Sequence, residues 1–291
     1  MQESKSDYLK LHISVLLSGF TGIFAKLISL NEVATVWYRM LFAFLLFAVI
    51  IFFTKHSLRE DFKEIIKICG LGMLLAIHLM FFFGSIKYAN VAVGTVCYSL
   101  VGFFTVIFEP FVLKMKFSFK ELFYSLLAVL GILLIFNFDT NFRFGIILGI
   151  ISAALFALYT MYNQIVEVGK SSRTMLFYEL LGGTLFMAAF LPVYNYFEPS
   201  NIIPIGYDWL WIILLAFFCT VLMYLMHISV LKTLSAFTVG LVGNLEPVYG
   251  IFFAILFLKE GHSLSFAFYI GMFLIFLSVF LQSFVKYKFI K

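Results

Sequence analysis

Charged residues are scarce in this sequence of 291 residues. Asp, Glu, Lys and Arg make up 12% of it, hydrophobic residues make up 63%, and the mean hydropathy is +1.07. A soluble domain carries roughly a quarter charged residues, so this chain has too few to cover a folded surface with polar groups. A soluble globular protein is therefore excluded, and the solvent that suits the composition is a lipid bilayer.

Other scarce or missing features exclude further classes. The three cysteines, Cys69, Cys97 and Cys219, lie in apolar segments without metal-ligand spacing, so we interpret them as buried hydrophobic side chains and predict no metal site. The chain has no Gly-rich phosphate-binding loop, so we expect no ATP hydrolysis and no cofactor. The net charge of +5 comes from basic residues between the apolar stretches, which does not indicate nucleic-acid binding.

The apolar stretches lack the alternating polarity of a transmembrane β-barrel and run to about 20 residues, the length at which a helix crosses a bilayer. The sequence therefore predicts an all-α membrane protein with about ten spans. We place these spans at 9–29, 33–53, 67–88, 91–113, 118–137, 144–165, 174–196, 208–231, 234–257 and 264–285.

The distribution of basic residues predicts the orientation. If the N-terminus is cytoplasmic, fifteen of the 20 Lys and Arg residues fall on cytoplasmic segments. These are Lys5, Lys10, Lys55, Arg59, Lys63, Lys67, Lys114, Lys116, Lys120, Lys170, Arg173, Lys232, Lys286, Lys288 and Lys291. We therefore expect the protein in the cytoplasmic (inner) membrane, with both termini in the cytoplasm. Termini on the same side require an even number of spans.

A weak internal repeat divides the chain. A shift of 145 residues without a gap lays Lys87-Tyr-Ala-Asn90 on Lys232-Thr-Leu-Ser235, and the same shift lays Lys114 on Lys259. Five spans in each half is an odd number, so the second half would be inserted upside down relative to the first. We predict a first five-helix repeat over 1–140 and an inverted one over 141–291, an arrangement typical of secondary transporters.

One segment carries a family resemblance. The run Asn244-Leu-Glu-Pro-Val-Tyr-Gly, followed by an apolar stretch that ends at Lys259-Glu260, resembles the ninth helix of the drug/metabolite transporter superfamily, EamA type. Arg39 in the second span and Lys87-Tyr88-Ala89 before the fourth are similar to the family as well. The resemblance implies a ten-helix carrier with an inverted repeat that exports amino acids, metabolites or drug-like compounds. The first half departs from the pattern, because Gly102 stands where Pro247 stands in the second half.

Glu246 is the leading candidate for transport, because an ionisable side chain within a span costs ~3 kcal/mol to insert. It lies about twelve residues into the ninth span, roughly 18 Å from the cytoplasmic end at 1.5 Å per residue. Pro247 frees a backbone carbonyl beside it, so Glu246 either exchanges a proton or holds the broken helix by a structural hydrogen bond. At the same depth of the fourth span, Tyr98 and Ser99 are cavity candidates. Ser99 and its repeat partner Asn244 are expected to face one another across the symmetry axis and line the cavity; ordinary interhelical bonding is the alternative.

Two further groups are candidates for solute binding. Tyr159 and Asn163 share a helix face in the sixth span, although aromatic residues near a membrane end also form interfacial belts. His78 falls within the third span and His227 within the eighth, one turn after Tyr224. A buried histidine can relay a proton, bind a solute or only form a core hydrogen bond.

Arg39 and Glu179 occupy the second and seventh spans, near the outer and the inner end respectively. We expect them to serve gating or structure, either by snorkelling to the interface or by an ion pair with Glu32 or another helix end. Pro247 belongs with them as a structural residue.

The sequence as a whole favours a secondary transporter that exports amino acids or similar small amphiphilic metabolites by alternating access, with proton coupling open. Apart from this small-molecule solute and the lipid bilayer, no partner is predicted. A channel or a non-transporting helper subunit is the alternative, although a channel would have polar rings along a pore. An intramembrane lipid-modifying enzyme is less favoured, because the loops hold no catalytic cluster, and we predict no catalytic residues.

Overall fold

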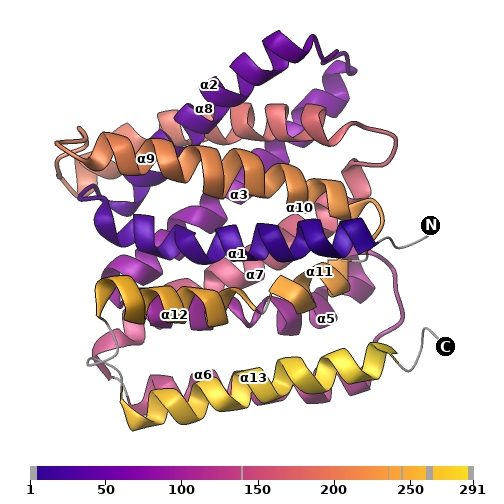
Figure 1. Cartoon of the computed structure of the whole chain (residues 1–291), viewed down its shortest axis with the longest axis vertical. Helices are drawn as coiled ribbons and strands as arrows, with labels where there is room; N and C mark the ends of the chain where they lie inside the picture. Colours follow the sequence, from indigo (N-terminus) through magenta and orange to yellow (C-terminus); the bar gives the residue numbers. More distant parts are fainter. Residues whose placement is uncertain (1–4, 139, 235, 244, 260–264, 288–291) are drawn as a thin grey trace.

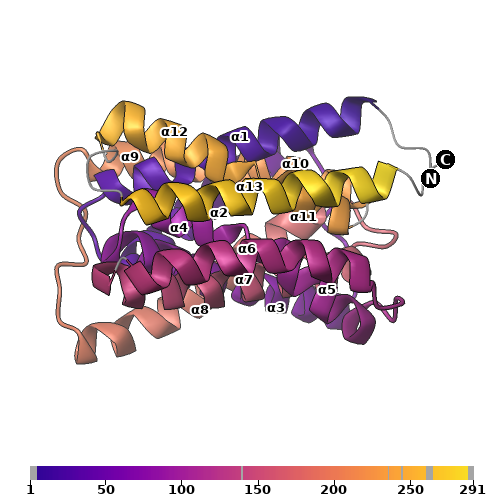
Figure 2. The same cartoon turned by 90° about the horizontal axis from the view of Figure 1, so that it is seen from below.

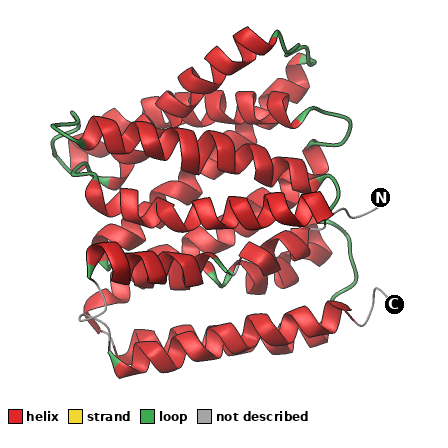
Figure 3. Cartoon of the chain, in the orientation of Figure 1, coloured by secondary structure: helices red, strands yellow, loops and turns green. Residues whose placement is uncertain are grey.

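The computed structural model describes the whole chain except residues 1–4, 139, 235, 244, 260–264 and 288–291. Within that part every regular element is a helix, and no strand is found (Figure 3). Eight helical segments are long and apolar enough to cross a membrane, and they coincide with the first eight predicted spans. The ninth and tenth predicted spans contain apolar helices that are shorter over the described residues.

The helices follow one another through short connections. Their bounds are α1 Lys5–Leu27, α2 Glu32–Thr54, α3 Phe62–Tyr88, α4 Val91–Tyr98, α5 Val101–Val112, α6 Phe119–Phe138, η1 Thr140–Phe142, α7 Arg143–Val166, α8 Ser172–Phe197, α9 Asp208–Ala216, η2 Phe217–Leu222, α10 Met223–Leu231, α11 Ala236–Gly243, α12 Glu246–Leu258 and α13 Phe266–Tyr287. Figure 1 shows them running across the bundle from one side to the other, and Figure 2 shows the same bundle from below.

Two of the predicted spans are each divided into a pair of short helices. The expected break beside Pro247 is present, because α11 ends before it and α12 begins at Glu246. A second break, which we did not predict, separates α4 from α5 at Ser99 and Leu100. Helices α4 and α11 begin and end 145 residues apart, and so do the first residues of α5 and α12, Val101 and Glu246.

Glycines let the helix backbones approach each other closely. A side chain at Gly72 of α3 would collide with the backbone of Glu179 in α8, and one at Gly182 of α8 would collide with that of Cys69 in α3. Gly131 of α6 and Gly271 of α13 face each other in the same way. Lipid tails are as apolar as Leu side chains, so helices in a bilayer associate by such close packing.

Packing between helices creates a central group and a peripheral pair. Helix α3 contacts α7 and α8, while α1 contacts α10 and α12. Helices α6 and α13 pack mainly against each other along one edge of the bundle (Figures 1 and 2). The two broken helices meet between these groups, since α4 contacts α12 and α5 contacts α11.

Candidate binding cavity

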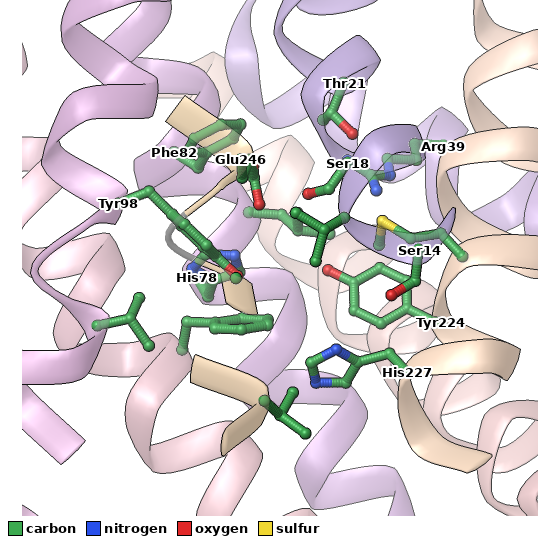
Figure 4. Close-up of a pocket in the computed structure, with 17 residues that line it drawn as sticks. Ser14, Ser18, Thr21, Arg39, His78, Phe82, Tyr98, Tyr224, His227 and Glu246 are labelled. Atoms are coloured by element: carbon green, nitrogen blue, oxygen red, sulfur yellow. The ribbon is translucent and has the colours of Figure 1, made fainter. Parts of the chain in front are cut away.

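A small cavity lies where the broken helices face α1, α3 and α10 (Figure 4). Its volume is about 40 Å³, which is room for a few water molecules and not for an amino acid. Any organic solute that binds here therefore requires the surrounding helices to move apart.

Helix α1 supplies a stripe of hydroxyl groups to one wall. Ser14, Ser18 and Thr21 are spaced by four and three residues, so they share one face of the helix, and all three line the cavity (Figure 4). Sequence reasoning did not single out these residues. The signal was visible, because hydroxyl side chains at helical spacing within an apolar span mark a face that does not contact lipid.

The opposite wall is built from rings. His78, Phe82, Tyr98 and Phe156 line the cavity and contact one another, with centroids 4.8 Å apart for His78 and Phe156 and 5.1 Å apart for Tyr98 and Phe156. The His78 ring also bonds to Ser152 on α7, at 2.9 Å from Nδ1 to the hydroxyl oxygen. Such a wall can contact an apolar part of a solute without requiring a hydrogen bond.

Glu246 is the acidic group of the cavity. It opens α12 directly after the break, and only 3% of it is exposed. The Ser18 hydroxyl lies beside it and is its hydrogen-bonding neighbour (Figure 4). The positive end of the α12 dipole favours a negative charge at this position. The break thus places a carboxyl group in the interior of the bundle rather than at a membrane surface.

Arg39 is the basic group of the cavity, and it neither reaches an interface by snorkelling nor pairs with Glu32. Its side chain is 0% exposed and lines the same space as Glu246. Arg39 Nε donates to the Thr220 hydroxyl at 2.7 Å, and one terminal nitrogen, Nη2, donates to the Cys219 carbonyl at 2.6 Å. Glu32, the partner we expected, instead accepts a hydrogen bond from the Tyr194 hydroxyl.

The segment that holds Arg39 is the π-helical turn η2 within the eighth predicted span. Such a turn displaces backbone carbonyls from the regular α-helical bonding pattern and is frequent at functional sites. Cys219 and Thr220, which accept from Arg39, both belong to this turn. Arg39 stays in the interior because η2 provides these acceptors.

Tyr224 and His227 of α10 complete the cavity. Their ring centroids lie 6.2 Å apart, and the Nε2 atom of His227 is buried without a hydrogen-bond partner. His78 and His227, which we expected in corresponding helices, therefore contribute to the same space but differ in their bonding.

The remaining predicted residues lie elsewhere. Tyr159 and Asn163 do not line the cavity, and both donate to Glu179, the hydroxyl of Tyr159 at 2.9 Å. The Ser99 hydroxyl donates to the Val96 carbonyl of its own chain segment at 2.6 Å. Asn244 is outside the described residues, so its predicted place opposite Ser99 is not addressed.

Pro247 occupies the first turn of α12, where its missing N–H removes no helical hydrogen bond. Its predicted structural role agrees with this geometry, because a proline in that place starts a helix without weakening it.

These features define a multi-pass membrane protein with a charged cavity inside its helix bundle. The EamA-like transporter family matches the chain twice, over residues 6–137 and 143–284. The chain therefore belongs to that family, as its sequence predicted, and the family is one of transporters rather than enzymes.

A comparison with solved structures agrees on the fold. One crystal structure, described only as that of a protein, has a TM-score of 0.70 with this chain and 16% sequence identity. The similarity covers 97% of this chain and 99% of the other. No curated protein matches the sequence.

Proposed function

We propose that this protein is a secondary transporter that exports amino acids or similar small amphiphilic metabolites by alternating access. The observation that carries the proposal is the cavity lined by Arg39 and Glu246, whose side chains are both buried inside a bundle of membrane helices. Charged groups are costly at such a position and are typically retained for a solute or ion pathway. The cavity is too small for an amino acid as it stands, which suits a site that opens to one side at a time.

The proposed architecture is ten spans in two inverted halves, 1–140 and 141–291. The family matches each half separately, and the two broken helices begin and end 145 residues apart. The contacts between helices support the same symmetry. Helix α3 contacts α7 and α8, the first two long helices of the second half, while its counterpart α9–η2–α10 contacts α1 and α2.

We further propose that both termini lie in the cytoplasm and that the membrane is the inner one. Helix α1 begins on the same side of the bundle as α13 ends, which suits an even number of spans (Figure 1). The excess of Lys and Arg on that side indicates the cytoplasm. A reporter fused to each end of the chain, active only in the cytoplasm, tests this orientation.

Flux measurements test the transport proposal directly. The purified protein is reconstituted into liposomes, and counterflow of labelled leucine, methionine and phenylalanine is compared with that of empty liposomes. Counterflow that saturates with solute concentration is expected for a carrier. Absence of flux for amino acids, nucleobases and cationic dyes alike would contradict it.

Glu246 is the proposed site of proton coupling, because its carboxyl group faces the cavity and has no ion-pair partner among the described residues. A carboxyl in this position can bind a proton when the cavity opens to one side and release it when it opens to the other. Flux measured from pH 5.5 to 8.5 is expected to depend on pH in the natural protein and not in Glu246→Gln. An unaltered pH dependence in the variant would contradict the role.

A further inference from the structure

Arg39 has a hydrogen-bonding capacity that the protein does not use. Nε and Nη2 have acceptors on η2, but the second terminal nitrogen, Nη1, is buried without a hydrogen-bond partner among the residues that the structure describes. An unpaired buried donor is costly, and more so when it is charged. Arginine keeps its charge at any physiological pH, so it cannot lower this cost by losing a proton.

Glu246 faces the same space but does not neutralise Arg39. Ion pairs within the described residues join Lys10 to Asp7 and Glu64 to both Lys67 and Lys170, and none joins Arg39 to Glu246. The two groups nevertheless interact electrostatically, and Figure 4 shows them facing the cavity from two sides, with Ser18 beside Glu246. The cavity thus holds one positive and one negative group that are separated by the space itself.

We propose that Nη1 of Arg39 is the carboxylate-binding group of this cavity. A carboxylate is a good partner for a guanidinium, because its two planar oxygens match the direction of the N–H bonds. The inference rests on the proposed transport function and names the chemistry that the transported solute must carry.

The rest of the cavity limits the solute further. Glu246 repels a second negative charge and attracts an ammonium group, so a molecule with one carboxylate and one amine satisfies both buried charges at once. The ring wall of Phe82, Tyr98 and Phe156 accepts an apolar side chain. The site therefore selects zwitterionic amino acids with apolar side chains over amines that lack the carboxylate.

A binding experiment with matched analogues tests the proposal on the natural protein. Labelled phenylalanine is bound to the detergent-purified full chain and displaced by unlabelled phenylalanine, by phenethylamine, which lacks the carboxylate, or by 3-phenylpropionate, which lacks the amine. Leucine, isoamylamine and isocaproate form a second set. We expect the amines to bind at least about tenfold more weakly than the amino acids, the loss of one charge-assisted hydrogen bond.

Variants assign the effect to Arg39. Arg39→Met is expected to weaken amino-acid binding at least about tenfold and to abolish the difference between amino acid and amine. Arg39→Lys is expected to keep part of the difference, because the positive charge remains. Thr220→Ser is the matched control, since its hydroxyl keeps an acceptor for Nε, and it should leave both affinity and discrimination as they are. Gel filtration establishes which variants are folded, and the analogue comparison on the natural protein does not depend on them.

The outcomes separate this proposal from the transport function. Equal binding of amine and amino acid to the natural protein, or unchanged discrimination in Arg39→Met, would overturn the role of Arg39. If the protein moves cationic dyes in liposomes but neither binds nor moves amino acids, the carboxylate site is wrong and transport stands. If no solute moves at all, the transport function itself fails.

Discussion

Glu179 and Glu246 are two carboxyl groups that the bundle buries almost completely, at 0% and 3% exposed, but their surroundings differ. Glu179 accepts hydrogen bonds from Tyr159 and Asn163 and lies away from the cavity. Glu246 faces the cavity, with Ser18 as its hydrogen-bonding neighbour. The oxygens of Glu179 are thus occupied by hydrogen bonds from the protein, whereas those of Glu246 remain accessible to a ligand in the cavity. Burial alone does not distinguish them.

Replacing each carboxyl group by an amide is the strongest test of this comparison. Glu246→Gln is expected to lower transport by about 10–100-fold, because a charge-assisted hydrogen bond to the solute is worth about 1.5–3 kcal/mol. Glu179→Gln is expected to keep transport within about twofold, since Asn163 can reverse its amide and use its unpartnered oxygen to accept from the new side chain. Initial rates of counterflow in liposomes measure both variants.

The control for this pair is the amount of folded protein, measured by gel filtration of each variant before reconstitution. A Glu179→Gln protein that is folded but inactive would place Glu179 in the transport pathway. A fully active Glu246→Gln protein would remove Glu246 from it.

For the stability of the bundle, in contrast to transport, Glu179 is expected to matter more than Glu246. Glu179→Ala leaves the Tyr159 hydroxyl and the Asn163 amide buried without their acceptor, at about 1–3 kcal/mol for each group. We expect the free energy of unfolding in mixed micelles to fall by about 2–4 kcal/mol. Tyr159→Phe removes one of the two bonds and should cost about 1–2 kcal/mol.

Coupling between these two changes sharpens the test. Because they remove parts of one network, the double variant should lose less than the two single variants together. If the two losses are additive, Glu179 and Tyr159 contribute independently, and the hydrogen bond between them does not stabilise the protein.

The positions of the helices were largely predictable, and so was one of the two breaks. Apolar runs of about 20 residues define spans without reference to any distant contact. Pro247 favours a helix start, because a proline further inside a helix removes a hydrogen bond, although Pro110 and Pro192 do lie inside helices. The break at Ser99 has no proline and no glycine to mark it. It becomes recognisable only through its repeat partner, Asn244, once the break in the second half is known.

The cavity was less predictable, because its members are fixed by contacts between distant segments. Arg39 was expected to snorkel to the interface or to pair with a helix end such as Glu32, but its position depends on Cys219 and Thr220, about 180 residues later. No local sequence pattern predicts the π-helical turn that makes these two acceptors available to Arg39. Tyr159 and Asn163 were grouped correctly on one helix face, but the face turns to Glu179 rather than to the cavity.

His78 and His227 differ in hydrogen bonding as the two carboxyl groups do, and the expected effects of replacing them are smaller. His78 is bonded to Ser152, whereas Nε2 of His227 is buried without a partner. His78→Leu removes the bond between the ring and Ser152, whose hydroxyl keeps the carbonyl of residue 78 as an acceptor, and should lower the free energy of unfolding by about 1 kcal/mol. His227→Leu should change it by less than about 0.5 kcal/mol, because it removes an unpaired polar group, while lowering transport. Unfolding in micelles and counterflow distinguish the two; equal loss of stability in both variants would contradict the distinction.

Glu167 is a third buried carboxyl group, and its expected effect is confined to stability. It lies between α7 and α8, only 3% exposed, and its Oε2 atom has no hydrogen-bond partner. Burial raises its pKa to about 7, although Lys232 opposes the rise. The folded protein therefore binds a proton on Glu167 more tightly than the unfolded chain, whose carboxyl has a pKa of about 4.3. Its contribution to stability is largest near pH 4 and declines as the pH rises to about 7.

Thermal unfolding in micelles at pH 5 and pH 8 measures this contribution. The natural protein is expected to lose stability between the two values, and Glu167→Gln, which cannot titrate, should lose less, by about 2 kcal/mol. Arg173→Gln, an exposed change nearby, is the control and should leave the pH dependence as it is. An identical slope in the natural protein and in Glu167→Gln would mean that Glu167 is charged at no cost in the folded state. In that case the Oε2 atom of Glu167 would be hydrogen-bonded to water, unlike the carboxyl oxygens of Glu179, which the protein occupies, and those of Glu246, which face the cavity.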